Sequence, residues 1–148
     1  MATVELTFTP LPAHVRTARL VATAVARRSG VDESLLDEVR LAVGEACSRA
    51  VEGHQLYCPA EPVRLALTDL AGRFEVEVTD TCATGDPGQA GIGSRPGSSD
   101  GPEGPDGAGL PAGLGIAVIE GLADDVQITT TSAGTSIRMS WPSVRPAR

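Results

Sequence analysis

Lysine is absent from this sequence, and all 12 basic residues are arginine. A phosphate-binding loop of the GxxxxGK[ST] type, the strand lysine of protein kinases and a Schiff-base lysine all need the missing side chain. Acidic residues outnumber basic ones by 19 to 12, whereas binding to nucleic acid or to an acidic membrane needs clustered positive charge. The composition therefore excludes many ATP-using folds and argues against nucleic-acid partners.

Cysteine, histidine and long apolar runs are also scarce. The 3 cysteines show no CxxC spacing, and Met1–Thr9 lacks a signal-peptide pattern, which indicates a reducing cytoplasm. His14 and His54 have no Cys or Glu at metal-ligand spacing and no neighbour in sequence that would orient a general base. No stretch approaches the roughly 18 to 20 apolar residues of a membrane span. We therefore expect a soluble, cytoplasmic protein without a zinc site.

The chain length of 148 residues and the apolar content of 41 % predict a single domain with one core. Apolar steps of three and four predict helices over 13–29, 34–54 and 114–122. Apolar alternation predicts strands near 4–8, 63–69, 73–80, 126–130 and 137–141, with a frayed tail at 142–148. This order predicts an α+β two-layer sandwich, in which a mixed, mostly antiparallel sheet carries helices on one face.

The helix predicted from Ser34 to His54 organises the rest of the chain. Asp32 or Ser34 can cap its start, and Gly53 stands where a helix usually stops. One apolar stripe should face the core: Leu35, Val39, Ala42, Ala46 and Ala50. A polar strip lies beside it: Glu38, Glu45, Ser48, Arg49 and Glu52. One interpretation of this strip is a solvated face with an i,i+4 ion pair, worth about 0.3 to 0.5 kcal/mol.

A segment from Thr84 to Gly113 has no apolar period, and half of its 30 residues are Gly or Pro. Such a loop inside a compact domain is either a functional lid or a disordered insertion. It lies between a strand that ends in Asp80 and a helix that opens with Gly113-Leu114-Gly115. The free backbone N–H groups at that helix start suit an anion such as phosphate.

Taken in this order, the segments resemble the anti-sigma regulatory factors of the GHKL ATPase/kinase superfamily. The resemblance covers the chain from about Phe8 to Trp141 and implies the Bergerat, or histidine-kinase-like ATPase, fold. The motifs that carry it are the E-A-x-x-x-A helix, the strand ending in Asp80, the glycine-rich lid, GLGIAVIEGLADDV and the closing GTSIRMSW.

The resemblance implies an ATP site. Asp80 would accept a hydrogen bond from the adenine amino group, and Glu45 would be the catalytic carboxylate that takes the proton of an incoming serine hydroxyl. The lid at 84–113 would close over the nucleotide. The nucleotide-binding positions would be Arg49, Asp80, Gly113, Leu114, Gly115 and Thr135.

The sequence departs from the family pattern at two places. The family usually has an Mg²⁺-binding Asn four residues after the catalytic Glu, where this chain has Arg49, a side chain with donors and no acceptor. Arg49 can contact phosphate oxygens directly, or it can pair with Glu45 and close the site. The usual D-x-G-x-G is also missing, because Asp80 is followed by Thr81-Cys82-Ala83-Thr84.

The function that the resemblance implies is partner switching in a bacterial stress response. The chain would sequester a sigma factor and be released by an anti-anti-sigma protein with a STAS domain. With ATP and Mg²⁺ it would act as a serine/threonine-protein kinase on that antagonist; the alternative is a sigma-binding module that works without nucleotide. A detached histidine-kinase-like domain would need a phosphoacceptor helix from another chain. A homodimer through the N-terminal strand and first helix is also implied by the resemblance.

Overall fold

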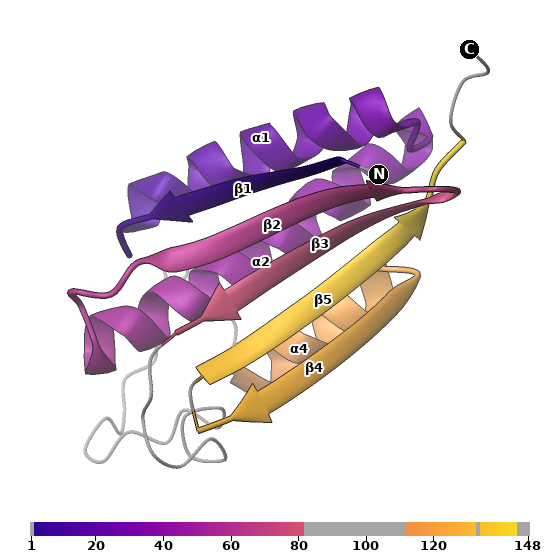
Figure 1. Ribbon diagram of the computed structural model, residues 1–148. Coiled ribbons are helices and arrows are strands. Elements are labelled where there is room, and N and C mark those ends of the chain that lie inside the picture. The colour runs from indigo at the N-terminus through magenta and orange to yellow at the C-terminus, as the bar shows by residue number, and fades with distance from the viewer. Residues whose placement is uncertain (1, 82–111, 133, 145–148) are drawn as a thin grey trace.

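The computed structural model describes residues 2–81, 112–132 and 134–144 as a sheet covered by helices (Figure 1). The elements are β1 Ala2–Phe8, α1 Pro12–Ser29, α2 Glu33–Tyr57, β2 Val63–Leu70, β3 Arg73–Asp80, α4 Ala112–Leu122, β4 Asp125–Thr131 and β5 Gly134–Pro142. The five strands have the order β1-β2-β3-β5-β4, and all four pairings are antiparallel. The predicted α+β two-layer sandwich is confirmed. The predicted lid lies outside the described residues, except for Ala112 and Gly113, which begin α4.

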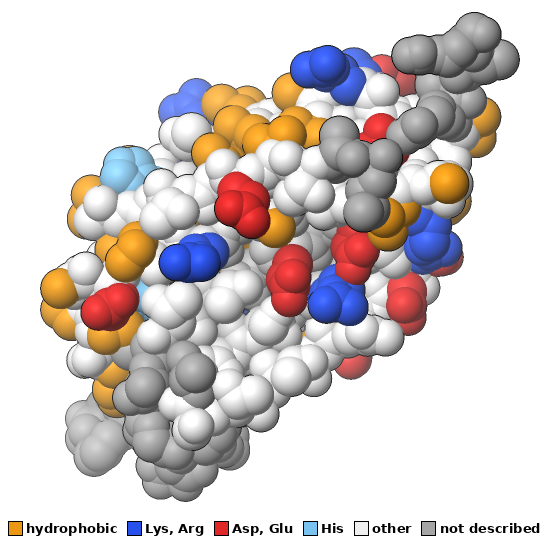
Figure 2. All heavy atoms as spheres, viewed as in Figure 1, with side chains coloured by type: hydrophobic (Ala, Val, Ile, Leu, Met, Phe, Trp, Pro, Cys, Tyr) orange, Lys and Arg blue, Asp and Glu red, His pale blue; other side chains and the backbone are white. Residues whose placement is uncertain are grey.

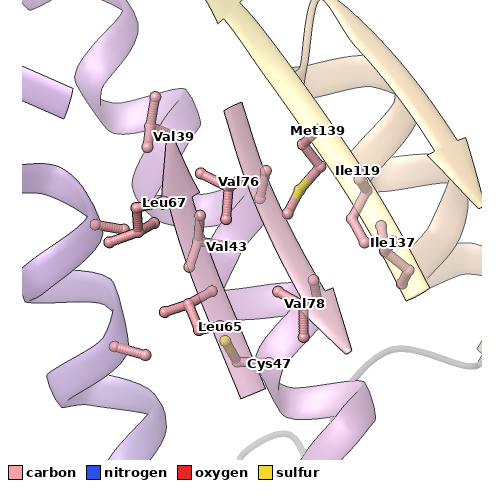
Figure 3. Close-up of a cluster of buried hydrophobic side chains, with 14 of the residues drawn as sticks. Val39, Val43, Cys47, Leu65, Leu67, Val76, Val78, Ile119, Ile137 and Met139 are labelled. Carbon is pink, nitrogen blue, oxygen red and sulfur yellow. The ribbon is translucent and has the colours of Figure 1, made fainter. Parts of the chain in front are cut away.

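The core lies between the sheet and helices α1, α2 and α4 (Figure 3). Alternate residues of the strands point toward the helices, which is why the predicted alternation coincides with burial. The labelled side chains come from α2, β2, β3, β5 and α4: Val39, Val43, Cys47, Leu65, Leu67, Val76, Val78, Ile119, Ile137 and Met139. Burial raises the pKa of the Cys47 thiol to about 12, so this side chain is a neutral part of the core.

Helix α2 is longer than its sequence pattern predicts. The Asp32 side chain caps the helix start by accepting a hydrogen bond from the Ser34 N–H at 3.0 Å. The predicted helix end at His54, beside the stop signal expected at Gly53, is wrong, because the helix continues to Tyr57. Gly53 does not adopt the positive φ of a helix-ending glycine, which Gly30 does adopt at the end of α1. The last turn of α2 therefore extends past Gly53 toward the end of β3.

The C-terminal segment stays hydrogen-bonded beyond β5. The Ser143 N–H donates to the Gly72 carbonyl at 3.0 Å, and the Val144 N–H donates to the Gly30 carbonyl at 2.9 Å. The fraying expected from Pro142 onward is therefore not seen at residues 143 and 144. The remainder of that predicted tail, 145–148, lies outside the described residues.

The sheet face away from the helices is polar, with acidic and basic side chains interspersed (Figure 2). Arg138 on β5 lies 2.9 Å from Glu75 and 3.7 Å from Glu77 on β3. Arg73 pairs with Asp124 at 2.9 Å. In the described parts of the chain, no helix combines the length and the apolar character that a membrane span requires.

The tryptophan Trp141 fixes the C-terminal end of α4 to the sheet. Its side chain is 1 % exposed. Its indole Nε1–H donates to the Leu122 carbonyl at 3.0 Å, and its ring lies 6.4 Å from that of Phe74. Because a buried indole N–H needs an acceptor, this bond sets the distance between the end of α4 and strand β5.

Candidate functional site

Most of the candidate residues gather where α2, α4, β3 and β5 come together at one end of the sheet. Asp80, the last residue of β3, is the direct register partner of Thr135 near the start of β5. Gly115, in the first turn of α4, lies against Glu45 and Arg49 of α2. Gly113 and Leu114 belong to the same first turn. Residues far apart in the sequence thus lie close together in the structure.

Glu45 packs directly against the backbone of Gly115. A Cβ atom at Gly115 would lie 2.6 Å from Glu45 Oε2 and 3.5 Å from its Cδ. Any residue larger than glycine at this position would therefore displace the Glu45 carboxylate. Burial raises the pKa of Glu45; Arg49 acts against this and Glu52 adds to it. A carboxylate beside the positive end of a helix is electrostatically favourable, and a raised pKa suits a side chain that must accept a proton.

Arg49 lies one turn beyond Glu45 and shares the contact with α4. Its Cδ would be 3.6 Å from a Cβ at Gly115. Its Nε is buried and has no hydrogen-bond partner within the described ranges. Burial lowers the pKa of Arg49, while the charges of Glu45, Asp80 and Glu52 raise it, and a guanidinium remains protonated at neutral pH. The ion pairs of the described residues, counted to 4.0 Å, do not include one between Arg49 and Glu45.

Asp80 has glycines close to it on two elements, β5 and α2. Gly134 at the start of β5 has a φ of 142°, and a Cβ there would lie 1.8 Å from the Asp80 carbonyl oxygen. A Cβ at Gly53 of α2 would lie 3.5 Å from Asp80 Oδ2. The Asp80 side chain is 25 % exposed, so its carboxylate is largely enclosed by protein.

The sequence did not single out His54 as a site residue, yet it contacts Asp80. Its Nε2 lies 3.0 Å from Asp80 Oδ1, and its side chain is fully buried. Its position three residues after Val51 and seven after Cys47 continues the buried stripe of α2, and a buried imidazole needs polar partners. His54 is the last residue of the helix predicted from the sequence, so its place on the buried stripe was a signal that the sequence already contained.

Comparison with known proteins identifies the family of this fold. The family model described as "Histidine kinase-like ATPase domain" matches residues 8–141. No curated protein sequence matches the chain significantly.

Two solved structures resemble the chain in fold. One is the crystal structure of the RsbU and RsbW domains of Rv1364c from Mycobacterium tuberculosis, with a TM-score of 0.67, 20 % identity and coverage of 100 % of this chain. The chain spans 34 % of that structure's length. The other is the mycobacterial sensor histidine kinase MprB, with a TM-score of 0.54, 17 % identity and coverage of 98 % of this chain and 100 % of that one. At these identities the likeness concerns the fold alone.

Proposed function

Because the chain belongs to the histidine kinase-like ATPase family, we propose that it binds ATP between α2, α4 and the ends of β3 and β5, and that it acts as an anti-sigma factor. It sequesters a bacterial sigma factor and is released by an anti-anti-sigma protein with a STAS domain. The observation that carries the ATP site is the meeting of Glu45, Arg49 and Gly115 at the first turn of α4.

The site residues form two groups, one suited to the adenine and the other to the phosphates of a nucleotide. The Asp80 carboxylate is an acceptor that suits the adenine amino group, and Thr135 is its register partner on β5. The first turn of α4, Gly113 to Gly115, offers backbone N–H groups to the phosphates. Arg49 adds a guanidinium whose buried Nε can donate to a phosphate oxygen.

Nucleotide binding in this family usually involves Mg²⁺, and the side chains here do not suit a magnesium ion. Mg²⁺ takes oxygen ligands, with one or two carboxylates among them. Arg49 stands at the position where the family has a ligand, and it carries positive charge and no acceptor. Within residues 2–81, 112–132 and 134–144, no group of three or more His, Cys, Asp or Glu side chains could hold a metal ion. The described residues therefore do not fit a magnesium ion.

The proposed enzymatic activity is transfer of the γ-phosphoryl group of ATP to a serine of the antagonist. The serine oxygen forms a bond to the γ-phosphorus as the bond from that phosphorus to the bridging oxygen breaks, and ADP leaves. Glu45 accepts the serine proton, which its raised pKa favours. Arg49 offsets charge on the transferred group.

The partner-switching role is supported by the motifs of the anti-sigma regulatory factors and by the fold shared with a structure that contains an RsbW domain. Homodimerisation through β1 and α1 is part of the same proposal. It is supported by the position of β1 at one edge of the sheet and by Val4 on that strand, which is 42 % exposed.

Two assays test the proposal. In the first, saturating ATP should stabilise the fold against unfolding by about 2.7 kcal/mol at one hundred times the dissociation constant, and Asp80→Asn should reduce this. In the second, radiolabelled ATP should label the STAS-domain antagonist with the wild type and not with Glu45→Ala, assayed with and without Mg²⁺. Stabilisation by ATP without labelling of the antagonist would indicate an anti-sigma factor that binds ATP and has no kinase activity.

A second candidate is a sigma-binding module that works without nucleotide. Arg49, at the position of the family's metal ligand, favours it. This candidate predicts no stabilisation by ATP and an unchanged affinity for the sigma factor in Arg49→Ala and Asp80→Asn. ATP-dependent stabilisation in the wild type would exclude it.

A further inference from the structure

One buried polar group at the site has no part in the proposed chemistry. His54, in the last turns of α2, is 0 % exposed and sits in an otherwise apolar stripe of that helix. Its imidazole meets three groups: the Glu61 carbonyl oxygen at 2.8 Å from Nδ1, Asp80 Oδ1 at 3.0 Å from Nε2, and the Thr81 N–H, whose nitrogen lies 3.2 Å from Nε2. Burying an imidazole is costly unless such partners satisfy it.

The chemistry of these partners restricts what the ring can do. A carbonyl oxygen is only an acceptor, so Nδ1 carries a proton and donates to Glu61. Nε2 faces an acceptor, the Asp80 carboxylate, and a donor, the Thr81 N–H. The imidazolium form donates to Asp80, and the neutral form accepts from Thr81. In both forms the ring is fixed against the last residue of β3 and the residue that follows it.

The same contacts tie the connection between α2 and β2 to the end of β3. His54 uses the carbonyl of Glu61, and the Thr81 hydroxyl donates to the carbonyl of Pro62 at 3.2 Å. Gly53, the residue before His54, packs beside Asp80 Oδ2. The end of α2 thus contacts Asp80 Oδ1 through the His54 imidazole and leaves space beside Asp80 Oδ2 at Gly53.

We propose that His54 is the positioning residue that sets the direction of the Asp80 carboxylate, and that it thereby gives the site its preference for adenine over guanine. This inference rests on the proposed ATP site. A carboxylate accepts more than one hydrogen bond, so a bond from the imidazolium form of His54 is compatible with a bond from an exocyclic amino group. Guanine presents a carbonyl where adenine presents that amino group, and two acceptors facing each other are unfavourable. The preference is therefore sensitive to the direction of the carboxylate.

The test measures the affinities of ATP, GTP and inorganic tripolyphosphate by calorimetry. In His54→Leu, the ATP-over-GTP preference should fall by about tenfold, the worth of one charge-assisted hydrogen bond, while the tripolyphosphate affinity stays at its wild-type value. His54→Gln places an amide N–H near the position of Nε2 and should retain part of the preference. The matched control is His14→Leu, which removes the other histidine, on α1, and should change none of the three affinities.

A double-mutant cycle separates positioning from general damage. If His54 acts through Asp80, the variant with both His54→Leu and Asp80→Asn should prefer ATP no less than Asp80→Asn alone. The inference is overturned if His54→Leu keeps the wild-type ratio, or if it weakens ATP and tripolyphosphate by the same factor. A wild-type protein that binds neither ATP nor tripolyphosphate would overturn the ATP site itself, and the inference with it.

A measurement without nucleotide tests the contact between His54 and Asp80 directly. The ¹⁵N resonances of the His54 ring should show a protonated Nδ1, and Asp80→Asn should shift the Nε2 resonance. An Nε2 resonance unchanged by Asp80→Asn would remove the contact on which the inference depends, whatever the nucleotide affinities are.

Discussion

Glu45 and Arg49 lie one turn apart on α2 and both reach Gly115 of α4, yet no ion pair within 4.0 Å joins them. The sequence left two alternatives, a pair that closes the site or two side chains that bracket a phosphate. Their separation favours the second alternative. The buried Nε of Arg49, which has no partner among the described residues, would gain one from an anion.

Arg49 should determine nucleotide affinity. Arg49→Ala removes a charge-assisted contact worth about 1.5 to 3 kcal/mol, so the ATP dissociation constant should rise by about tenfold or more. Calorimetry at one fixed salt concentration measures this. The control is Arg40→Ala on the same helix, whose ion pair with Asp37 is exposed and should change the affinity by less than about twofold. Equal losses in both variants would contradict a specific phosphate contact.

Nucleotide binding should not depend on a divalent cation. Because Arg49 supplies positive charge at the ligand position, a chelator should leave the wild-type ATP affinity unchanged. Arg49→Asn restores an amide oxygen that Mg²⁺ can use, so its ATP affinity should increase when Mg²⁺ is added. A wild-type protein that binds ATP only with Mg²⁺ would show that Arg49 does not take the place of the cation.

Glu45→Gln should stabilise the fold increasingly as pH rises. Burial raises the folded-state pKa of Glu45. The protonated form of Glu45 therefore contributes to the stability of the fold, fully below the unfolded-state pKa, and this contribution is lost as pH rises through the folded-state pKa. The amide does not ionise, so the stability gap between variant and wild type should widen from about pH 4 to pH 7. Urea unfolding across that range measures the gap. Stabilities of variant and wild type that run parallel with pH would contradict a raised pKa of Glu45 in the folded state.

The same variant separates binding from transfer. Glu45→Gln removes a negative charge beside the proposed phosphate position and should bind ATP at least as tightly as the wild type at pH about 7. It should no longer transfer the phosphoryl group, since an amide does not accept the serine proton. Weaker ATP binding in Glu45→Gln would place this carboxylate in direct contact with a nucleotide donor group.

Gly115→Ala should act on the site rather than on the fold. The atom that a new Cβ would meet at 2.6 Å is the end of the flexible Glu45 side chain, so the carboxylate moves and the helix stays. The ATP affinity should fall by about tenfold, while the free energy of unfolding stays within about 1 kcal/mol of the wild type. On the same helix, Gly121→Ala meets nothing within 4 Å and should stabilise by about 0.4 to 1 kcal/mol without changing ATP affinity.

Two turn glycines provide matched variants that test whether Gly134 positions Asp80. Gly72 and Gly134 both have positive φ, but a Cβ at Gly72 meets nothing within 4 Å, and one at Gly134 would lie 1.8 Å from the Asp80 carbonyl oxygen. Gly72→Ala should cost about 1 to 2 kcal/mol of stability from φ alone, and Gly134→Ala about 1 to 3 kcal/mol more from crowding. Chemical denaturation measures both. Only Gly134→Ala should lower the ATP affinity, and equal effects would contradict the role of Gly134.

The fold could be predicted because periodicity and burial coincide. Leu65, Leu67, Val76 and Val78 alternate in the sequence and are all buried on one sheet face. What the pattern could not supply was the end of α2. A glycine stops a helix by adopting positive φ, and Gly53 does not, so its presence in the sequence was not sufficient to locate the stop.

The sequence could nominate those candidate residues that belong to a motif, but not the contacts that arise only from packing. Asp80 ends a predicted strand and Thr135 belongs to the GTSIRMSW motif, and the two are register partners although they are 55 positions apart in the sequence. The contact between His54 and Asp80 joins the end of the predicted helix to the end of β3, and the carbonyl of Glu61 holds the other side of the imidazole ring. No spacing encodes that contact, since it forms only when α2 and β3 pack together.

The fixed position of Trp141 has a practical use. It is the only tryptophan of the chain, and its indole is bonded to the last residue of α4, the helix whose other end forms part of the proposed ATP site. Indole emission is therefore a label-free optical signal for any shift of α4 against the sheet, and titrating ATP while recording it would show whether that helix moves when nucleotide binds.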